Sequence, residues 1–375
     1  MLFARRWGAV ALWALALLAL VGGALYSRTQ SGFAEDFLPA YGAARSLRIL
    51  GDPYAASPFV PFVYPPSSAL LLWPLGYLGQ AAAGDVGLLV ACASLAVLAC
   101  TSVALAGERA SGPWAAAVVL VLAATNLGYG TVQLGNLTVM VVALLAVALL
   151  LLCRGRALPA AAALGVAIAF KPLVGPAVLV FAMGRRWRAL AVALVVPAAL
   201  NVLALPLLES PTTYVRQVLP SLVSGASVTR AHNVALVGWG RRAGAPEALV
   251  LTFRVAVIGL AVAVCLRAAR LGGSRAVVLW GTVPVLAVAV ASGIDESHYS
   301  LVAVPLLVAL ASRANPVRTG IVLLSAVLVT VSATAGLQLI GQLLALVAAG
   351  LASGSAGPDG EAKRISSAVA IRSAP

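Results

Sequence analysis

The chain has 375 residues, of which 62% are hydrophobic and only 10% are charged. Soluble domains are about half apolar and a quarter charged, so this composition excludes an ordinary soluble enzyme, and its hydrophobicity excludes a disordered chain. The net charge of +14 comes from basic clusters between apolar runs, without the interleaved aromatic residues of a nucleic-acid-binding surface, which argues against a nucleic-acid partner.

Apolar runs recur from residue 9 to residue 352, and most approach the roughly 20 residues that a helix needs to cross a bilayer. The sequence therefore predicts an all-α polytopic membrane protein with about 10–12 membrane helices, including broken or dipping ones, in one domain over 1–352. The first run is expected to be a retained helix, not a cleaved signal peptide. The expected segments are 9–26, a short helix at 67–79, 85–106, 113–127, 137–153, a broken pair at 158–183, 188–208, 248–267, 275–292, 299–312, 318–335 and 337–352.

Basic clusters set the expected orientation, because cytoplasmic loops of membrane proteins are enriched in arginine and lysine. The long connections 27–66 and 209–247 and the turn 292–299 then lie outside, and residues 353–375 form a disordered cytoplasmic tail. This orientation requires 67–79 to dip into the outer leaflet and 158–183 to enter and leave on the cytoplasmic side. The clusters are Arg5-Arg6, Arg154/Arg156, Arg185-Arg186/Arg188, Arg267/Arg270/Arg275 and Arg313/Arg318.

The first outer connection carries the acidic pair Glu35-Asp36 directly after the first apolar run. A carboxylate at this boundary can act as a general base on a hydroxyl group that comes within hydrogen-bond reach. The alternative is that the pair only caps a helix suggested by 41–50, because acidic residues are favoured at helix N-termini.

Lys171, followed by Pro172, interrupts the run 158–183, because proline cannot continue a helical hydrogen-bond ladder. About 13 residues of helix before it rise roughly 20 Å, which would carry Lys171 past the middle of a core about 30 Å thick. A lone lysine at that depth should face a polar cavity or an anion. The alternative is a lysine that snorkels from a helix end to the membrane surface.

The two histidines both fall in predicted outer segments: His232 in the second long connection, and His298 after Asp295-Glu296. His298 can serve as a general acid, a phosphate contact or a plain interfacial residue. A divalent cation held by Asp295, Glu296 and His298 is conceivable, although the spacing is not diagnostic. The four cysteines show no metal-ligand spacing and are interpreted as packing residues.

Several of these stretches together resemble the GT-C superfamily of membrane glycosyltransferases, and within it the families that use polyprenyl-phosphate-linked sugars. Two groups are candidates. The first choice is the arabinofuranosyltransferases of the mycobacterial α-(1→3) type. The second is the α-mannosyltransferases, because His298, seven residues before Pro305, resembles a histidine of that group. The stretches are Asp36–Tyr41 with Gly51, Tyr54 and Tyr64-Pro65-Pro66, then Gln133-Leu134-Gly135-Asn136, Phe170-Lys171-Pro172-Leu173-Val174-Gly175-Pro176, Asn201–Pro206 and His232–Gly238.

The resemblance implies an inverting transfer of a sugar from a polyprenyl-phosphate donor to a hydroxyl of an envelope glycan or glycolipid, on the outer face of the plasma membrane. Asp36 would be the general base, and Glu35 would shape the acceptor site or be the alternative base. Lys171 and Arg230 would face the donor phosphate, where a fixed cation lowers the barrier. The other residues expected to bind substrate are His298, His232, Asn233, Tyr41, Tyr64 and Asp295.

A transporter or flippase for a lipid-linked sugar is the alternative class. Transporters place ionisable residues near the midplane in paired broken helices, whereas most ionisable residues here gather at loops and helix ends. The sequence therefore favours an enzyme. The abundance of arginine, alanine and valine is typical of a high-GC genome, as in actinobacteria.

Overall fold

The computed structural model describes residues 2–30, 32–55, 62–220, 233–292, 297–311, 316–331 and 334–354. Helices make up the architecture of these ranges, and no β-strand occurs in them. The predicted all-α class is therefore confirmed.

Six helices in the described ranges are long and apolar enough to cross a membrane, which confirms the polytopic prediction. The longest have 26 residues and so rise about 39 Å. The six are α1 (Leu2–Ser27), α4 (Gln80–Leu105), α10 (Trp187–Ala204, continued by the 3-10 helix η3, Leu205–Leu207), α13 (Glu247–Ala268), α14 (Gly273–Ala291) and α17 (Ala335–Gly354).

Shorter helices fill the space between and above these. The α-helices among them are α2 (Phe37–Arg48), α3 (Pro66–Leu72), α5 (Pro113–Ala124), α6 (Asn126–Leu134), α7 (Thr138–Cys153), α8 (Ala157–Phe170), α9 (Leu179–Met183), α12 (Leu236–Arg242), α15 (Ala303–Leu310) and α16 (Pro316–Val331). The remaining turns are the 3-10 helices η1 (Trp73–Tyr77), η2 (Pro172–Val178) and η5 (Ser297–Val302), and the π-helix η4 (Tyr214–Val218).

The sequence did not predict α6, which follows α5 at a bend of 64°. Gly128 makes this bend possible, because a Cβ atom there would lie 2.0 Å from the carbonyl oxygen of Leu122. The two helices therefore form one sharply broken apolar segment, and α6 ends beside the start of α7.

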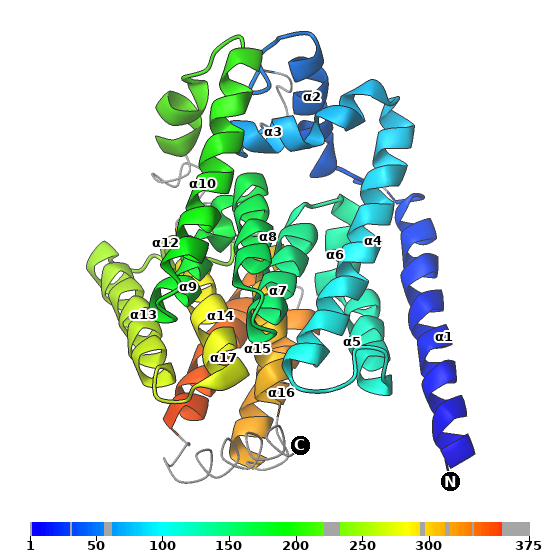
Figure 1. The fold of residues 1–375 in the computed structure, drawn as a ribbon, viewed down its shortest axis with the longest axis vertical. Coiled ribbons are helices and arrows are strands. Elements are labelled where there is room, and N and C mark those ends of the chain that lie inside the picture. Colours follow the sequence, from blue (N-terminus) through cyan, green and yellow to red (C-terminus); the bar gives the residue numbers. More distant parts are fainter. Residues whose placement is uncertain are drawn as a thin grey trace, which may run out of the picture.

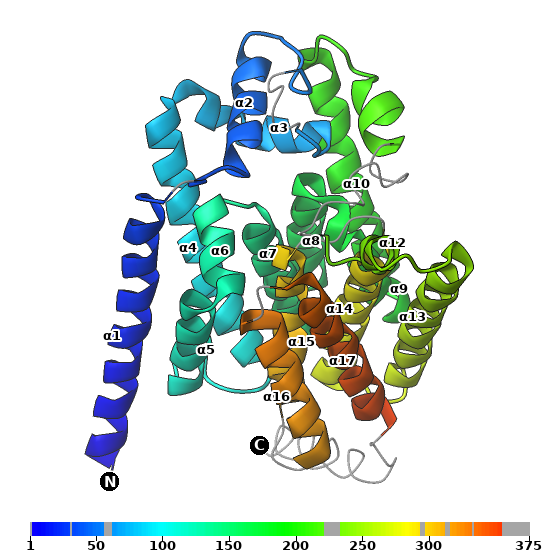
Figure 2. The same ribbon diagram turned by 180° about the vertical axis from the view of Figure 1, so that it is seen from behind.

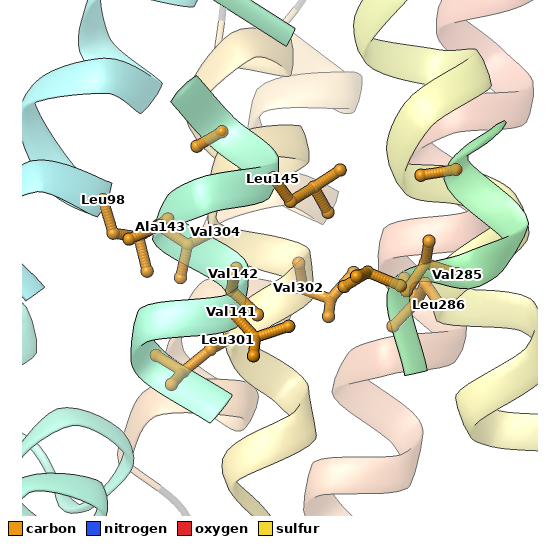
Figure 3. Packing of buried hydrophobic residues seen from close by; sticks show 14 of the residues in the cluster. Leu98, Val141, Val142, Ala143, Leu145, Val285, Leu286, Leu301, Val302 and Val304 are labelled. Atoms are coloured by element: carbon orange, nitrogen blue, oxygen red, sulfur yellow. The ribbon is translucent and has the colours of Figure 1, made fainter. Parts of the chain in front are cut away.

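Helix α7 lies at the centre of one continuous apolar core and packs against α4, α8 and α14 (Figure 3). The buried residues of α7 are mostly alanine, valine and leucine, which fill the space between the helices at the density of a protein interior. The labelled core residues are Leu98 of α4, Val141, Val142, Ala143 and Leu145 of α7, Val285 and Leu286 of α14, and Leu301, Val302 and Val304 of η5 and α15.

Different elements lie at the two ends of the long helices. The first turns of α1 and the α13–α14 connection lie at one end, and α2 and α3 lie at the other (Figures 1 and 2). The segments that carry the arginine clusters at 5–6 and 267–275 therefore share one end, and the side of a membrane that this end faces stays a prediction. Helix α3 runs across the direction of α4 and α10, as expected for a segment that does not cross.

Candidate active site

Asp36 stands at the start of α2, where the chain that leaves α1 meets the end of α6. Two backbone hydrogen bonds hold this crossing: the N–H of Ala34 donates to Gln133 (2.8 Å) and the N–H of Asp36 donates to Leu134 (3.0 Å). Asp36 occupies the N-cap position of α2, but its side chain makes no capping hydrogen bond there. The carboxylate is therefore directed to another partner.

Gly135 brings that partner close. It ends α6 with a φ of +65°, and a Cβ atom on it would lie 2.9 Å from the Cβ of Phe37. Only glycine fits this left-handed conformation and this close approach without strain. The next residue, Asn136, is thereby presented to the first turn of α2.

A chain of hydrogen bonds leads from Asp36 into the protein. Asn136 Nδ2 donates to Asp36 Oδ2 over 2.8 Å, and Asn136 Oδ1 accepts from the backbone N–H (2.9 Å) and the hydroxyl (2.6 Å) of Thr138. Lys171 Nζ donates to Thr138 Oγ1 over 2.8 Å. Asn136 and Thr138 are buried and Lys171 is only 6% exposed, so three inner links are shielded from water.

Lys171 is positioned by the end of α8, where it is the C-cap residue. Its extended backbone (φ −152°, ψ 114°) and the following Pro172 stop the helix, which leaves the last carbonyls of α8 without helical partners. Ser67 Oγ donates to the carbonyl of Ala169 (2.7 Å), and Ser68 Oγ donates to that of Phe170. The first turn of α3 thus completes the broken end of α8.

Aromatic rings surround the ammonium group of Lys171. Its Nζ lies 4.1 Å from the ring centroid of Tyr299 and 5.4 Å from that of Tyr64. Such contacts with ring faces stabilise a cation that has lost most of its water. The predicted polar surroundings of Lys171 therefore include a hydroxyl and two tyrosine rings among the described residues.

Tyr64 is held in turn by Tyr54, which precedes it in the connection between α2 and α3. The Tyr54 hydroxyl donates to the backbone carbonyl of Tyr64 over 3.2 Å, and the Tyr54 ring lies 6.0 Å from that of Tyr214. Burial raises the pKa of Tyr54, and the charges of Tyr214 and Asp52 add to the rise, so the hydroxyl stays a donor.

His298 begins the apolar segment formed by η5 and α15, and it is 3% exposed. Its ring packs edge-on to that of Tyr299 with 4.9 Å between centroids, and the Tyr299 ring also contacts Lys171 Nζ. The structure therefore gathers Asp36, Lys171, His298 and Tyr64 from four distant parts of the sequence around the ends of α6, α7 and α8.

Other predicted site residues lie elsewhere or serve the fold. Glu35 is exposed, next to Asp36. The buried Tyr41 stacks on Phe37 and its hydroxyl donates to the carbonyl of Leu78 (2.8 Å). Asn233 is buried, and its Oδ1 accepts from the N–H of Ala235 before α12. Arg230, His232 and Asp295 lie outside the described residues.

The sequence analysis gave no role to Asn136, Thr138, Tyr299, Ser67 or Ser68. A signal existed only for Asn136, which closes the quoted stretch from Gln133 and follows a glycine that could end a helix. Within the described residues, no three His, Cys, Asp or Glu side chains come together as metal ligands.

An apolar cavity of about 200 Å³ lies beside Asn136. Its walls come from α3, η1, α4 and the first turns of α7, its lining is mostly apolar, and Asn136 is the lining residue with a polar side chain. The lining includes Leu71, Leu75, Val90, Val139 and Met140.

The chain is similar to known proteins over most of its length. It matches the glycosyltransferase family 87 over residues 62–293, which contains Asn136, Thr138 and Lys171 but not Asp36 or His298. The α-(1→3)-arabinofuranosyltransferase of Mycobacterium tuberculosis is 30% identical over 254 residues, 65% of this chain and 57% of the relative. The protein of that name from Mycolicibacterium smegmatis is 29% identical over 260 residues, 67% of this chain and 59% of the relative.

The chain thus spans less than two thirds of the length of these curated relatives. No solved structure matches it.

Proposed function

The chain belongs to glycosyltransferase family 87, and on that basis we propose that it is a membrane glycosyltransferase of the GT-C type. It transfers arabinofuranose from a polyprenyl-phosphate donor to a hydroxyl of an envelope glycan or glycolipid. The observation that carries the proposal is the hydrogen-bonded connection between a carboxylate, Asp36, and a buried ammonium group, Lys171. The relatives' name supports the choice of sugar.

The proposed reaction is a direct inverting displacement. The acceptor hydroxyl attacks the anomeric carbon while the bond from that carbon to the donor phosphate oxygen breaks. The hydroxyl proton passes to Asp36, and the electron pair of the broken bond leaves with the phosphate. Lys171 contributes a positive charge fixed in a water-poor site, which stabilises the phosphate as its negative charge grows.

The donor's isoprenoid chain explains the apolar cavity beside Asn136. A hydrocarbon chain enters such a space because contact with water is removed from both surfaces. The sugar phosphate would then stay at the polar edge, near the proposed base.

The remaining roles rest on the resemblance. Arg230 would contact the donor phosphate and His232 would bind substrate, both from the second long connection, and His298 would bind the phosphate or the sugar. Asn233, Tyr64 and Asp295 would line the substrate site. We place the reaction on the outer face of the plasma membrane, where α2 and α3 would lie if the arginine clusters are cytoplasmic.

An assay with purified protein tests the proposal. Protein is incubated with a synthetic polyprenyl-phosphate arabinofuranose and an oligoarabinofuranoside acceptor, and in parallel with the mannose donor. We expect product from the arabinose donor. Asp36→Asn should lower kcat about 10³-fold, because general-base catalysis contributes roughly 10²–10⁴-fold.

Asp85→Asn is the matched control, since Asp85 is an exposed aspartate in an ion pair with Arg28, and its activity should stay within about threefold of wild type. A large loss in Glu35→Gln with a normal Asp36→Asn would transfer the base role to Glu35. Binding of the donor without turnover by the unmodified protein would favour the transporter instead. Faster turnover of the mannose donor than of the arabinose donor would show that the transferred sugar is mannose.

A further inference from the structure

We infer that Asn136 and Thr138 are positioning residues that couple the proposed base to the buried cation. This inference rests on the proposed function and deepens it. Neither residue carries a charge, and both are buried between Asp36 and Lys171. Their task would be to hold the carboxylate in one orientation during transfer.

The orientation of the Asn136 amide follows from its neighbours. The backbone N–H of Thr138 can only donate a hydrogen bond, so the atom that faces it must be the amide oxygen. The amide nitrogen then faces Asp36 Oδ2, 2.8 Å away. A flipped amide would place oxygen against oxygen on one side and donor against donor on the other.

The Thr138 hydroxyl is fixed in the same way. An ammonium group has no acceptor, so Thr138 Oγ1 must accept from Lys171 and direct its own hydrogen to Asn136. Every link therefore runs in one direction, from the lysine to the carboxylate. Aligned hydrogen bonds polarise one another and are stronger in a buried, low-dielectric setting.

This arrangement assigns separate tasks to the two oxygens of Asp36. Oδ2 is held by Asn136 Nδ2, and Oδ1 is the atom that receives the proton of the acceptor hydroxyl. Because Asn136 follows Gly135, whose left-handed turn packs against Phe37, the amide cannot move without moving the start of α2. The carboxylate is thus aimed by the turn between α6 and α7.

Thr138→Val tests the coupling with almost no change in shape. Valine keeps the backbone N–H that orients Asn136, but it lacks the hydroxyl that joins the amide to Lys171. We expect kcat to fall at least about tenfold with the KM for the donor within threefold, because a hydrogen bond to a charged group is lost in the transition state but substrate contacts remain. Thr138→Ser keeps a hydroxyl and should restore most of kcat.

Asn136→Asp gives an independent reading, because it replaces the donating Nδ2 by an oxygen that faces Asp36. We expect a loss of kcat of about 100-fold or more, larger than that of Thr138→Val. Elution as a single symmetric peak and a melting temperature near that of wild type show that each variant is folded. If Thr138→Val does not fold, the other two variants test the coupling: it predicts that Thr138→Ser keeps most of kcat and that Asn136→Asp loses about 100-fold or more.

Wild-type kcat in Thr138→Val or Asn136→Asp, alongside an inactive Asp36→Asn, would overturn the coupling and leave the proposed function intact. Equal loss in Thr138→Val and Thr138→Ser would also overturn it, because the hydroxyl would then be irrelevant. A wild-type protein without activity toward either donor would overturn both proposals.

Discussion

Two pairs of opposite charges among the described residues, Arg28 with Asp85 and Lys171 with Asp36, are built in contrasting ways. Arg28, after α1, contacts Asp85 of α4 directly at 3.0 Å, and both side chains are about half exposed. Lys171 and Asp36 are joined only through an amide and a hydroxyl, with the lysine buried among aromatic rings. The direct pair is open to water, whereas Lys171 of the indirect pair is buried and the two residues that join it to Asp36 are buried as well.

The contrast illustrates that a short distance between two charges does not by itself mean a large contribution to stability or function. An exposed ion pair gains little, because water and salt screen it and two flexible side chains must be ordered. A buried lysine loses its hydration and is retained only when the surroundings replace it. Thr138, Tyr299 and Tyr64 contact the ammonium group in place of water, and we therefore expect the buried pair, not the exposed one, to serve the proposed function.

Among the tests of this comparison between the two pairs, removal of the buried cation should have the largest effect. Lys171→Met keeps the length and the apolar stem of the side chain but removes the charge, so kcat should fall about 100-fold or more, as when a preorganised electrostatic contact is lost. Turnover of the arabinose donor measures it. The matched control is Arg28→Gln, which removes an exposed arginine and should leave kcat within threefold. Near-normal turnover in Lys171→Met would contradict the comparison.

The hydroxyls that complete α8 should have an intermediate effect on stability. Ser67→Ala and Ser68→Ala each leave a buried carbonyl without its hydrogen bond, which costs about 1–3 kcal/mol of unfolding free energy. A lower melting temperature in detergent measures this loss. Ser102→Ala is the control, because Ser102 Oγ donates to the carbonyl of Leu98 within its own helix and the residue is equally buried. A smaller loss in Ser67→Ala and Ser68→Ala than in the control would refute the bracing role.

The exposed pair should have the smallest effect. In a double-mutant cycle of Arg28→Gln and Asp85→Asn, the coupling free energy should be below about 1 kcal/mol and should shrink further at high salt. Thermal unfolding of the four proteins at low and high salt gives the value. A coupling of several kcal/mol, insensitive to salt, would show that exposure does not weaken this pair.

Much of the fold could be predicted from the sequence, because crossing a membrane leaves long apolar runs that are visible without any tertiary contact. The break at Lys171-Pro172 was predictable for the same reason, since proline acts through its own backbone. Helix α6 was not, because glycines and polar residues interrupt its apolar pattern. Its existence depends on Gly128, which permits contact with the end of α5.

The site was predictable only in part. Asp36 and Lys171 were identified as charged residues in apolar surroundings, but nothing local indicates that Asn136 bridges toward them across 100 residues of chain. That contact is tertiary and requires the left-handed turn at Gly135. Tyr41 is a residue that the sequence assigned to the site but that the structure uses for packing. A tyrosine ring can stack on a sugar, but this one is buried and its hydroxyl donates to the carbonyl of Leu78.

The short helix α3 has a further consequence. Its serines grip the last turn of α8, and Leu71 and Leu72 at its other end form a wall of the apolar cavity. A single two-turn lever therefore touches both the hydrocarbon space and the residue before Lys171. If the hydrocarbon tail of the proposed donor fills that space, it would contact α3, and any shift of α3 would reach the end of α8 through the two serines. Under the proposed function, lipid occupancy and the placement of the buried charge would then be coupled.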